Sequence, residues 1–175
     1  MDTKNRFDGR TTYQLIRLEY AIGLLFSIAV AVIHIKSIRW IPFIGLFAYI
    51  DVIGYIPGAI AYRRSGDGRI SRIYYLLYNT THSMAFNAAV AGLWVLLIGP
   101  EWSLLALPIH LCGDRGLFGN YLKPFSVPFE PHVIPAFTRF EDEIGRGLES
   151  ARRLPRAAVA PASHDIGKAE GAAAS

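Results

Sequence analysis

Five ionisable side chains lie within stretches that are otherwise apolar, and they are the residues of this chain most able to do chemistry: Glu19, Asp51, His82, His110 and Asp114. If those stretches cross a bilayer, an ionisable group that faces lipid costs roughly 2.5 to 3.5 kcal/mol. We therefore expect the five side chains to face one another or a wet cavity. Such a cluster predicts a functional site, although it does not by itself name the reaction.

The spacing of these residues indicates which kinds of site they could form. In the stretch HLCGD, His110 and Asp114 stand four residues apart, which places them on one face of a helix. Such a pair can ligate one metal ion, or the carboxylate can fix the tautomer of the imidazole. Tyr78 and His82 have the same spacing in the stretch YNTTHS. Two histidines with one or two carboxylates are a ligand set for zinc or a similar divalent metal.

Three interpretations of this polar cluster stay open at the level of the residues. The first is a metal site, although the chain has no compact motif such as HExxH. The second is a network of interhelical hydrogen bonds that orients the helices. The third is a relay that passes protons along the same side chains.

The apolar residues around the cluster predict a membrane protein. Hydrophobic residues make up 52% of the 175 residues and are concentrated in residues 13–122. A membrane-spanning helix needs about 20 mainly apolar residues. Four stretches approach that length: 13–35, 40–62, one that begins within 73–81 and ends at 98, and 102–121. The expected fold is all-α with four transmembrane helices, and Pro57 predicts a kink in the second one.

Basic residues predict the orientation of this bundle. They are frequent in the N-terminal segment and in the loop 63–72, and sparse in the two loops on the other side. By the positive-inside rule both termini lie in the cytoplasm, which predicts a multi-pass protein of the inner membrane. The net charge of +4 is therefore no sign of nucleic-acid binding. The single cysteine, Cys112, excludes an internal disulfide.

The polar remainder of the chain divides into three parts besides the helical domain 13–122. Residues 1–12 are expected to be flexible. Four prolines within residues 123–136 exclude a regular helix there and predict an irregular segment at the membrane surface. Apolar residues then recur at helical spacing over 137–154, which predicts an interfacial amphipathic helix, and residues 155–175 are expected to be disordered.

The five ionisable residues also lie at similar predicted depths in the membrane. At about 1.5 Å per residue, all of them fall within about 8 Å of depth, between the cytoplasmic face and the midplane. We therefore predict one shared site. In the metal hypothesis the ligands include His82, His110 and Asp114, and Asp51 or Glu19 is the general base. Arg115 or Lys123 would then bind an anionic headgroup.

Three stretches resemble an uncharacterised family of small four-helix bacterial membrane proteins, classed as a domain of unknown function: YNTTHS (78–83), HLCGDRGLFGNYLK (110–123) and FEPHV (129–133). The family's motifs are a Tyr-Asn and His pair, a His-x-x-x-Asp-Arg element leading to Leu-Lys, and a later Phe and His. They fall here on Tyr78, Asn79, His82, His110, Asp114, Arg115, Leu122, Lys123, Phe129 and His132.

The resemblance implies site residues and no reaction. It adds His132 to the metal ligands and Tyr78, Asn79 and Lys123 to the substrate contacts. The Thr-His-Ser triplet with a later His and Asp is also similar to membrane-bound metal-dependent hydrolases, although the arginine expected near Tyr78 is absent.

The function expected from these residues is metal-dependent hydrolysis of a lipid or amphipathic substrate that enters from the cytoplasmic leaflet. Two other functions stay open. One is an accessory or assembly subunit of a larger membrane complex, with a protein partner or as a homo-oligomer. The other is translocation of protons or ions through the polar cluster.

Overall fold

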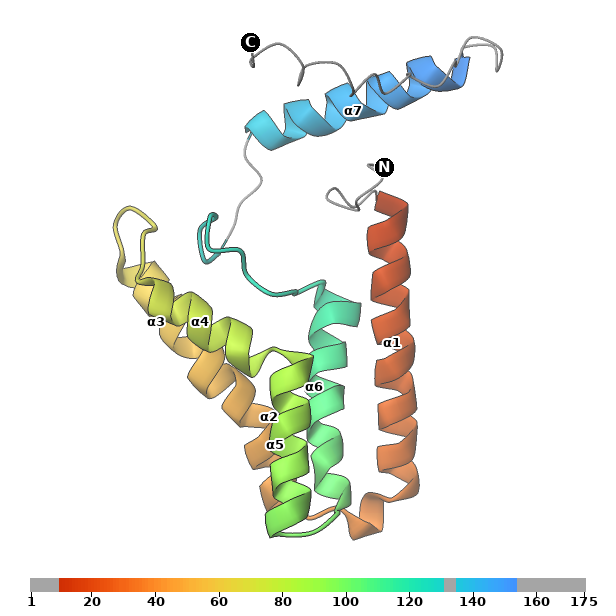
Figure 1. Ribbon diagram of the computed structural model, residues 1–175, viewed down its shortest axis with the longest axis vertical. Coiled ribbons are helices and arrows are strands. Elements are labelled where there is room, and N and C mark those ends of the chain that lie inside the picture. The colour runs from red at the N-terminus through yellow and green to blue at the C-terminus, as the bar shows by residue number, and fades with distance from the viewer. Residues whose placement is uncertain (1–9, 131–134, 154–175) are drawn as a thin grey trace, which may run out of the picture. The chain divides into compact units, whose positions relative to one another are not determined.

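The computed structural model of the chain describes residues 10–130 and 135–153, which fall into two units. In these residues every regular element is helical and no strand occurs, as the sequence predicts. The first unit holds α1 (Arg10–Ile33), η1 (Ile35–Ser37), α2 (Trp40–Gly54), α3 (Ile56–Arg64), α4 (Arg72–Thr81), α5 (Met84–Leu97), η2 (Trp102–Leu105), α6 (Ala106–Gly113) and η3 (Asp114–Phe118) (Figure 1). The second unit holds α7 (Pro135–Arg153).

Two helical stretches are long and apolar enough to cross a membrane, Thr11–Ile33 and Trp40–Arg64. An apolar helix in the core of a soluble protein would be mostly buried. Here only 11% of the apolar part of the first stretch and 28% of the second are buried inside the protein. Large side chains such as Leu25 and Ile41 point outward from them. An apolar surface of this kind favours a lipid surrounding over water.

The second stretch is interrupted at Tyr55, so that α2 and α3 are separate helices (Figure 1). Pro57 is the physical cause, because proline lacks the N–H that would bond to the carbonyl four residues earlier. The break therefore lies where the sequence predicts it, one turn beyond Asp51. Gly54 lets the end of α4 pack closely against α2, because a Cβ at this position would overlap the hydroxyl of Thr81 and lie only 3.1 Å from the ring of His82.

The other two predicted spans are not continuous helices. α4 ends at Thr81 and α5 begins at Met84, where the Ser83 hydroxyl accepts a hydrogen bond from the backbone N–H of Phe86. α5 has 14 residues, fewer than the roughly 20 that a spanning helix needs. The last stretch begins with the 3₁₀ turn η2 and ends with η3, a turn of π-helix. Single π-helical turns are frequent at functional sites.

Two buried clusters hold the first unit together. One lies between α2 and α6 and is formed by Leu46, Ile50, Ala106, Leu107 and Leu111, with side chains of α5 packed against it. The other joins α3 and α4 to the segment immediately after η3, which we call the strap (residues 119–130). It consists of Ala59, Tyr75, Tyr78 and Phe129. A Cβ on Gly58 would overlap the ring of Phe129, so this glycine admits the strap.

Hydrogen bonds from α3 and α4 fix the course of the strap. The side-chain amide of Asn79 donates to the carbonyl of Lys123 at 2.9 Å and accepts from its N–H at 2.7 Å. The hydroxyl of Tyr75 donates to the carbonyl of Val127, and that of Tyr62 donates to the carbonyl of Glu130. The strap has no regular secondary structure, and these bonds satisfy backbone groups that helices or sheets would otherwise pair.

Candidate metal centre

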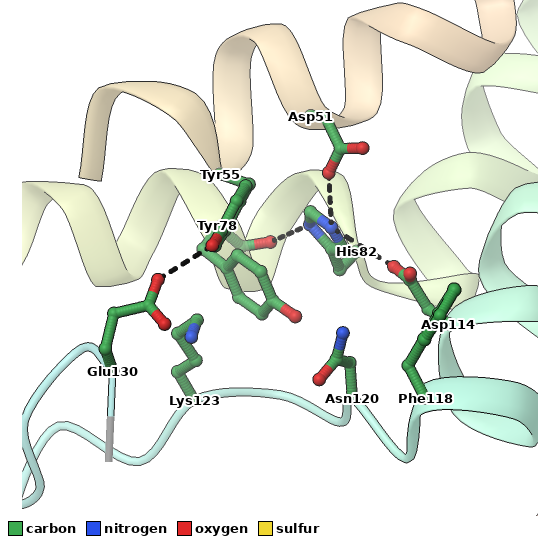
Figure 2. A pocket seen from close by; sticks show the side chains of 9 residues that line it. All are labelled: Asp51, Tyr55, Tyr78, His82, Asp114, Phe118, Asn120, Lys123 and Glu130. Carbon is green, nitrogen blue, oxygen red and sulfur yellow. Dashed lines mark hydrogen bonds and ion pairs between the residues drawn. The ribbon is translucent and has the colours of Figure 1, made fainter. Parts of the chain in front are cut away.

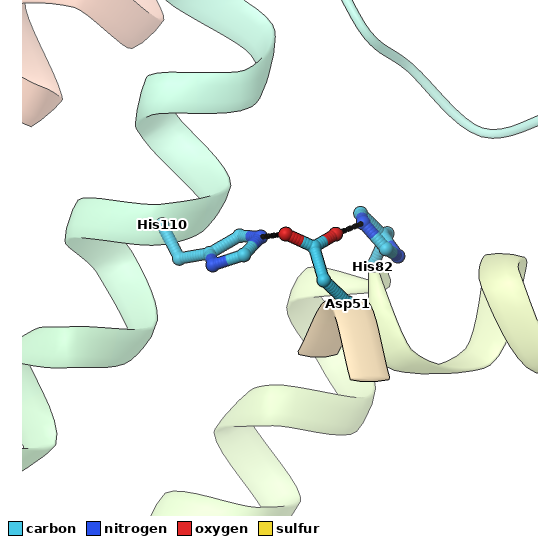
Figure 3. A group of neighbouring side chains, drawn as sticks. All are labelled: Asp51, His82 and His110. Carbon is cyan, nitrogen blue, oxygen red and sulfur yellow. Dashed lines mark ion pairs between the residues drawn. The ribbon is translucent and has the colours of Figure 1, made fainter. Parts of the chain in front are cut away.

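Four of the five ionisable side chains converge at one point in the first unit. Asp51 comes from α2, His82 from the junction of α4 and α5, and His110 from α6, while Asp114 is the first residue of η3. Nε2 of His82 lies 3.4 Å from a carboxylate oxygen of Asp51 and 3.4 Å from one of Asp114. Nε2 of His110 lies 3.6 Å and 3.5 Å from oxygens of the same two carboxylates. Asp51 thus stands between the two imidazoles (Figure 3).

These separations are those of ligands around a shared ion. Ordinary N–H···O hydrogen bonds measure about 2.7 to 3.2 Å, which is shorter than all four contacts. Ligand atoms at ~2.1 Å from a tetrahedral metal lie ~3.4 Å from one another. Asp51, His82 and His110 lie close enough to hold a metal ion, with one ligand atom from each within 4.8 Å of the others. Asp51 was predicted as a general base, and the structure places it among the possible ligands.

The proton on His82 can be assigned from its neighbours. Nδ1 lies 3.0 Å from the carbonyl oxygen of Tyr78 and 3.1 Å from the hydroxyl of Thr81. A carbonyl only accepts, so Nδ1 carries a proton and donates it there. The other ring nitrogen, Nε2, is directed at the two carboxylates. Histidines that bind metals commonly donate their other N–H to a backbone carbonyl in this way.

Stacking holds the ring of His82 in this orientation. The rings of Tyr78 and His82 are 3.9 Å apart between centroids and inclined by 15°. Their spacing of four residues on α4 predicted that the two side chains share a face, and this is confirmed. Tyr78 also lines the cavity beside the four ionisable groups (Figure 2).

His110 is the least satisfied buried group of the site. Its side chain is 3% exposed and packs against the ring of Phe47. Neither ring nitrogen has a hydrogen-bond partner of ordinary geometry in the described residues. Buried polar atoms nearly always have partners, and an orphaned pair calls for an explanation such as a bound ion.

Arg115 is buried and does not join the four groups. Its Nη2 donates to the carbonyl of His82 and its Nη1 to the hydroxyl of Tyr20, both at 2.9 Å. It lines neither cavity that borders the four groups. Its guanidinium ties α1 and η3 to the backbone that carries His82, and the role of Arg115 as a headgroup contact stays a prediction.

Glu19 is also placed away from the site. It is exposed on α1 and lines neither cavity, so the structure does not support it as the general base. Asn79, predicted as a substrate contact, instead holds the backbone of Lys123. His132, predicted as a fourth ligand, lies outside the described residues.

A polar cavity of about 300 Å³ opens beside the four groups (Figure 2). It is lined by Asp51, Tyr55, Tyr78, His82, Asp114, Phe118, Asn120, Lys123 and Glu130. Tyr55, Phe118, Asn120 and Glu130 were not predicted from the sequence. Asn120 and Glu130 belong to the strap, which has no periodicity from which their position could be inferred.

Lys123 lines this cavity, as a substrate contact would. Its Nζ donates to the carbonyl of Phe129 at 2.5 Å and lies over the rings of Tyr78 and Phe129, at 4.8 and 4.3 Å from their centroids. Burial lowers the pKa of the Lys123 ammonium, and the nearby Glu130 carboxylate opposes that shift.

The chain was compared with models of protein families, with curated proteins and with solved structures, and none of the three comparisons found a match. The two family resemblances drawn from the motifs stay predictions. The geometry of the site is therefore the basis on which a function can be proposed.

Proposed function

We propose that this protein is a membrane-embedded, metal-dependent hydrolase whose divalent ion, zinc or a similar metal, is held by the histidines and carboxylates of the candidate centre. The observation that carries the proposal is the meeting of two buried imidazole nitrogens with the carboxylates of Asp51 and Asp114 at separations of 3.4 to 3.6 Å. Imidazole nitrogens and carboxylate oxygens gathered in this way are a ligand set for a divalent ion. A dication also balances the two carboxylate charges.

The proposed setting is the inner membrane, with four spans and both termini in the cytoplasm. Two helices of suitable length and the outward-facing apolar side chains support a bilayer location. The broken α4–α5 and η2–α6–η3 segments would supply the other two spans. Interrupted helices are tolerated at membrane depth where they line a cavity, as they do here.

Three of the four side chains are assigned as metal ligands, and the fourth is assigned as the general base that accepts a proton from water. Catalytic zinc sites commonly use three protein ligands and keep one position open. Asp51, His82 and His110 each offer a ligand atom within 4.8 Å of the others. Asp114 lines both cavities and lies within 3.5 Å of both histidine nitrogens, so it is the base next to the open position. This reverses the roles that the sequence predicted for Asp51 and Asp114.

The reaction consumes one water molecule. A divalent ion held by Asp51, His82 and His110 would lower the pKa of a bound water toward neutrality. Asp114 accepts a proton from the water, whose oxygen forms a bond to the carbonyl carbon or phosphorus of the substrate. The bond from that atom to the leaving group breaks, and the proton held by Asp114 passes to the leaving group. The products are an acid and an alcohol or amine.

Oxygen-18 labelling tests this proposal directly. Zinc-loaded protein in lipid nanodiscs is incubated in ¹⁸O-water with a panel of single-chain esters, amides and phosphate esters. We expect one ¹⁸O atom in the acid product, measured by mass spectrometry. Asp114→Asn should reduce the rate by at least about 100-fold, the lower range of what a general base contributes, while zinc stays bound.

The control for this experiment is His34→Ala. His34 stacks on Trp102, away from both cavities, so its loss should leave the labelling rate within about twofold of wild type. Absence of label from every substrate in the panel would contradict the proposal. So would an Asp114→Asn variant as active as wild type.

A further inference from the structure

A second cavity, of about 390 Å³, lies on the other side of the same carboxylates. Its lining is almost entirely apolar and comes from α1, α2, α6 and η3: Leu24, Ile28, Phe47, Ile109, Gly113 and Leu117, with His110. It shares Asp51, Asp114 and Phe118 with the polar cavity. A polar chamber and an apolar chamber therefore meet at the candidate metal centre.

The apolar cavity is only partly enclosed by α1, α2 and α6. α1 and α2 both pack against α6, and the cavity is lined by side chains of all three. Ile28, Phe47 and Leu117 in its wall are exposed, so the opening itself has an apolar rim. In a bilayer such an opening faces the lipid chains, and a hydrocarbon chain can enter without crossing water.

We infer that the site binds an amphiphile with one hydrocarbon chain and an anionic headgroup. The chain occupies the apolar cavity between α1 and α2. The headgroup occupies the polar cavity, next to Lys123. The bond at the head of the chain then lies beside Asp51 and Asp114, where the two cavities meet. The position of that bond and the anionic charge of the headgroup rest on the proposed function, because the metal ion balances the carboxylates of Asp51 and Asp114 in the lining, whereas the binding of a single hydrocarbon chain does not.

The volumes favour one chain over two. A small group such as a water molecule takes up ~30 Å³ of condensed phase. On that scale the apolar cavity holds roughly a dozen carbon atoms and the polar cavity roughly ten non-hydrogen atoms. A two-chain lipid would leave one chain outside the apolar cavity.

The charge of the headgroup follows from Lys123. Among the described residues it is the one lysine or arginine in the lining of either cavity, and Arg115 donates to His82 and Tyr20 instead. Its ammonium has three donors, of which one is used by the carbonyl of Phe129. The opposing carboxylate, Glu130, already accepts a hydrogen bond from the hydroxyl of Tyr55 at 2.8 Å (Figure 2).

Photolabelling in nanodiscs tests the inference without any turnover. The probe is dodecylphosphonate with a diazirine in its chain, which has no ester bond to hydrolyse. We expect the label on peptides that contain the apolar lining residues of α1, α2 and α6. Unlabelled dodecylphosphonate should compete at least about tenfold better than either dodecyltrimethylammonium or didodecyl phosphate. Equal competition by the cationic or two-chain compound would overturn the inference.

A matched pair of glycine variants tests the apolar cavity. A Cβ on Gly113 would lie 4.0 Å from the side chain of Leu24, which is an ordinary contact, and Gly113 lines the cavity, so we expect the longer side chain of Gly113→Leu to fill it. We expect at least tenfold weaker labelling. Gly92 on α5 has open space around its Cβ position, and Gly92→Leu should label as wild type does. Equal labelling of the two variants would place the chain elsewhere.

The polar end is tested with Lys123→Met. This variant should lose the preference for phosphonate over trimethylammonium while it keeps the preference for one chain over two. A retained phosphonate preference would exclude Lys123 as the headgroup contact. Because labelling needs no chemistry, its absence from a protein that hydrolyses substrates overturns only this inference. Labelling without ¹⁸O incorporation overturns only the proposed hydrolysis.

Discussion

Replacing His110 with alanine is expected to lower the zinc affinity of the protein by more than about 100-fold. Loss of a partner outside the metal's own ligands typically costs 10- to 100-fold, and loss of a ligand costs more. Within residues 10–130 the other imidazole at the site, His82, already faces the same two carboxylates and cannot take the place of His110. The affinity is measured by competition with a chromophoric chelator in detergent solution.

Two further measurements keep this prediction separate from a packing effect. His34→Ala removes a histidine of the same chain that stacks on Trp102 outside the site, and it should bind zinc as wild type does. Zinc at 100 times its dissociation constant should stabilise the wild-type protein by about 2.7 kcal/mol, and His110→Ala should show no such gain. Equal zinc affinity of wild type and His110→Ala would show that His110 is not a ligand.

Phe129→Ala is expected to destabilise the protein by about 3 to 5 kcal/mol, the usual cost of truncating a buried phenylalanine. The ring is fully buried and lies against three tyrosines, with centroids 5.4 to 6.2 Å apart: Tyr55, Tyr75 and Tyr78. It also supports the Nζ of Lys123. The loss would be measured by equilibrium unfolding in mixed micelles.

Phe125 supplies the matched control for this prediction, because it lies in the same strap but is 50% exposed. Phe125→Ala should cost clearly less than Phe129→Ala, since half of the side chain is already exposed. Zinc affinity should survive Phe129→Ala, because all four residues of the metal centre come from the helical elements α2, α6 and η3 and the α4–α5 junction. An equal loss of unfolding free energy in the two variants would mean that the buried ring of Phe129 does not hold the strap against α3 and α4.

The convergence of Asp51, His82, His110 and Asp114 could be predicted, because their predicted depth in the membrane and their helical spacing both place them together. The position of Glu19 away from the site could not be predicted. Depth along a helix says nothing about direction around it, and Glu19 shares the depth of the site but faces away from it. Arg115 differs for the same reason, since it is one residue beyond Asp114 and therefore points about 100° around the helix, toward His82 and Tyr20.

In the fold, too, some features follow from the local sequence and others depend on contacts between distant residues. The break near Pro57 follows from the chemistry of proline alone. The break after Thr81 has no proline or glycine to mark it, and Ser83 as a helix cap was the one available signal. The course of the strap depends on hydrogen bonds to Asn79, Tyr75 and Tyr62, which are contacts over more than 40 residues. The positions of Lys123, Asn120 and Glu130 could not be inferred before those contacts were known.

The central claim is that Asp51, His82 and His110 bind one metal ion, with Asp114 beside it. It is tested most directly by X-ray absorption at the zinc edge, on full-length protein loaded with zinc and dialysed. We predict one zinc per chain with nitrogen and oxygen ligands at about 2.0 to 2.2 Å, at least two of them imidazoles. Cys112 is outside the group, so no sulfur shell at about 2.3 Å is expected. Folded protein that retains no zinc, or zinc bound through sulfur, would contradict the account.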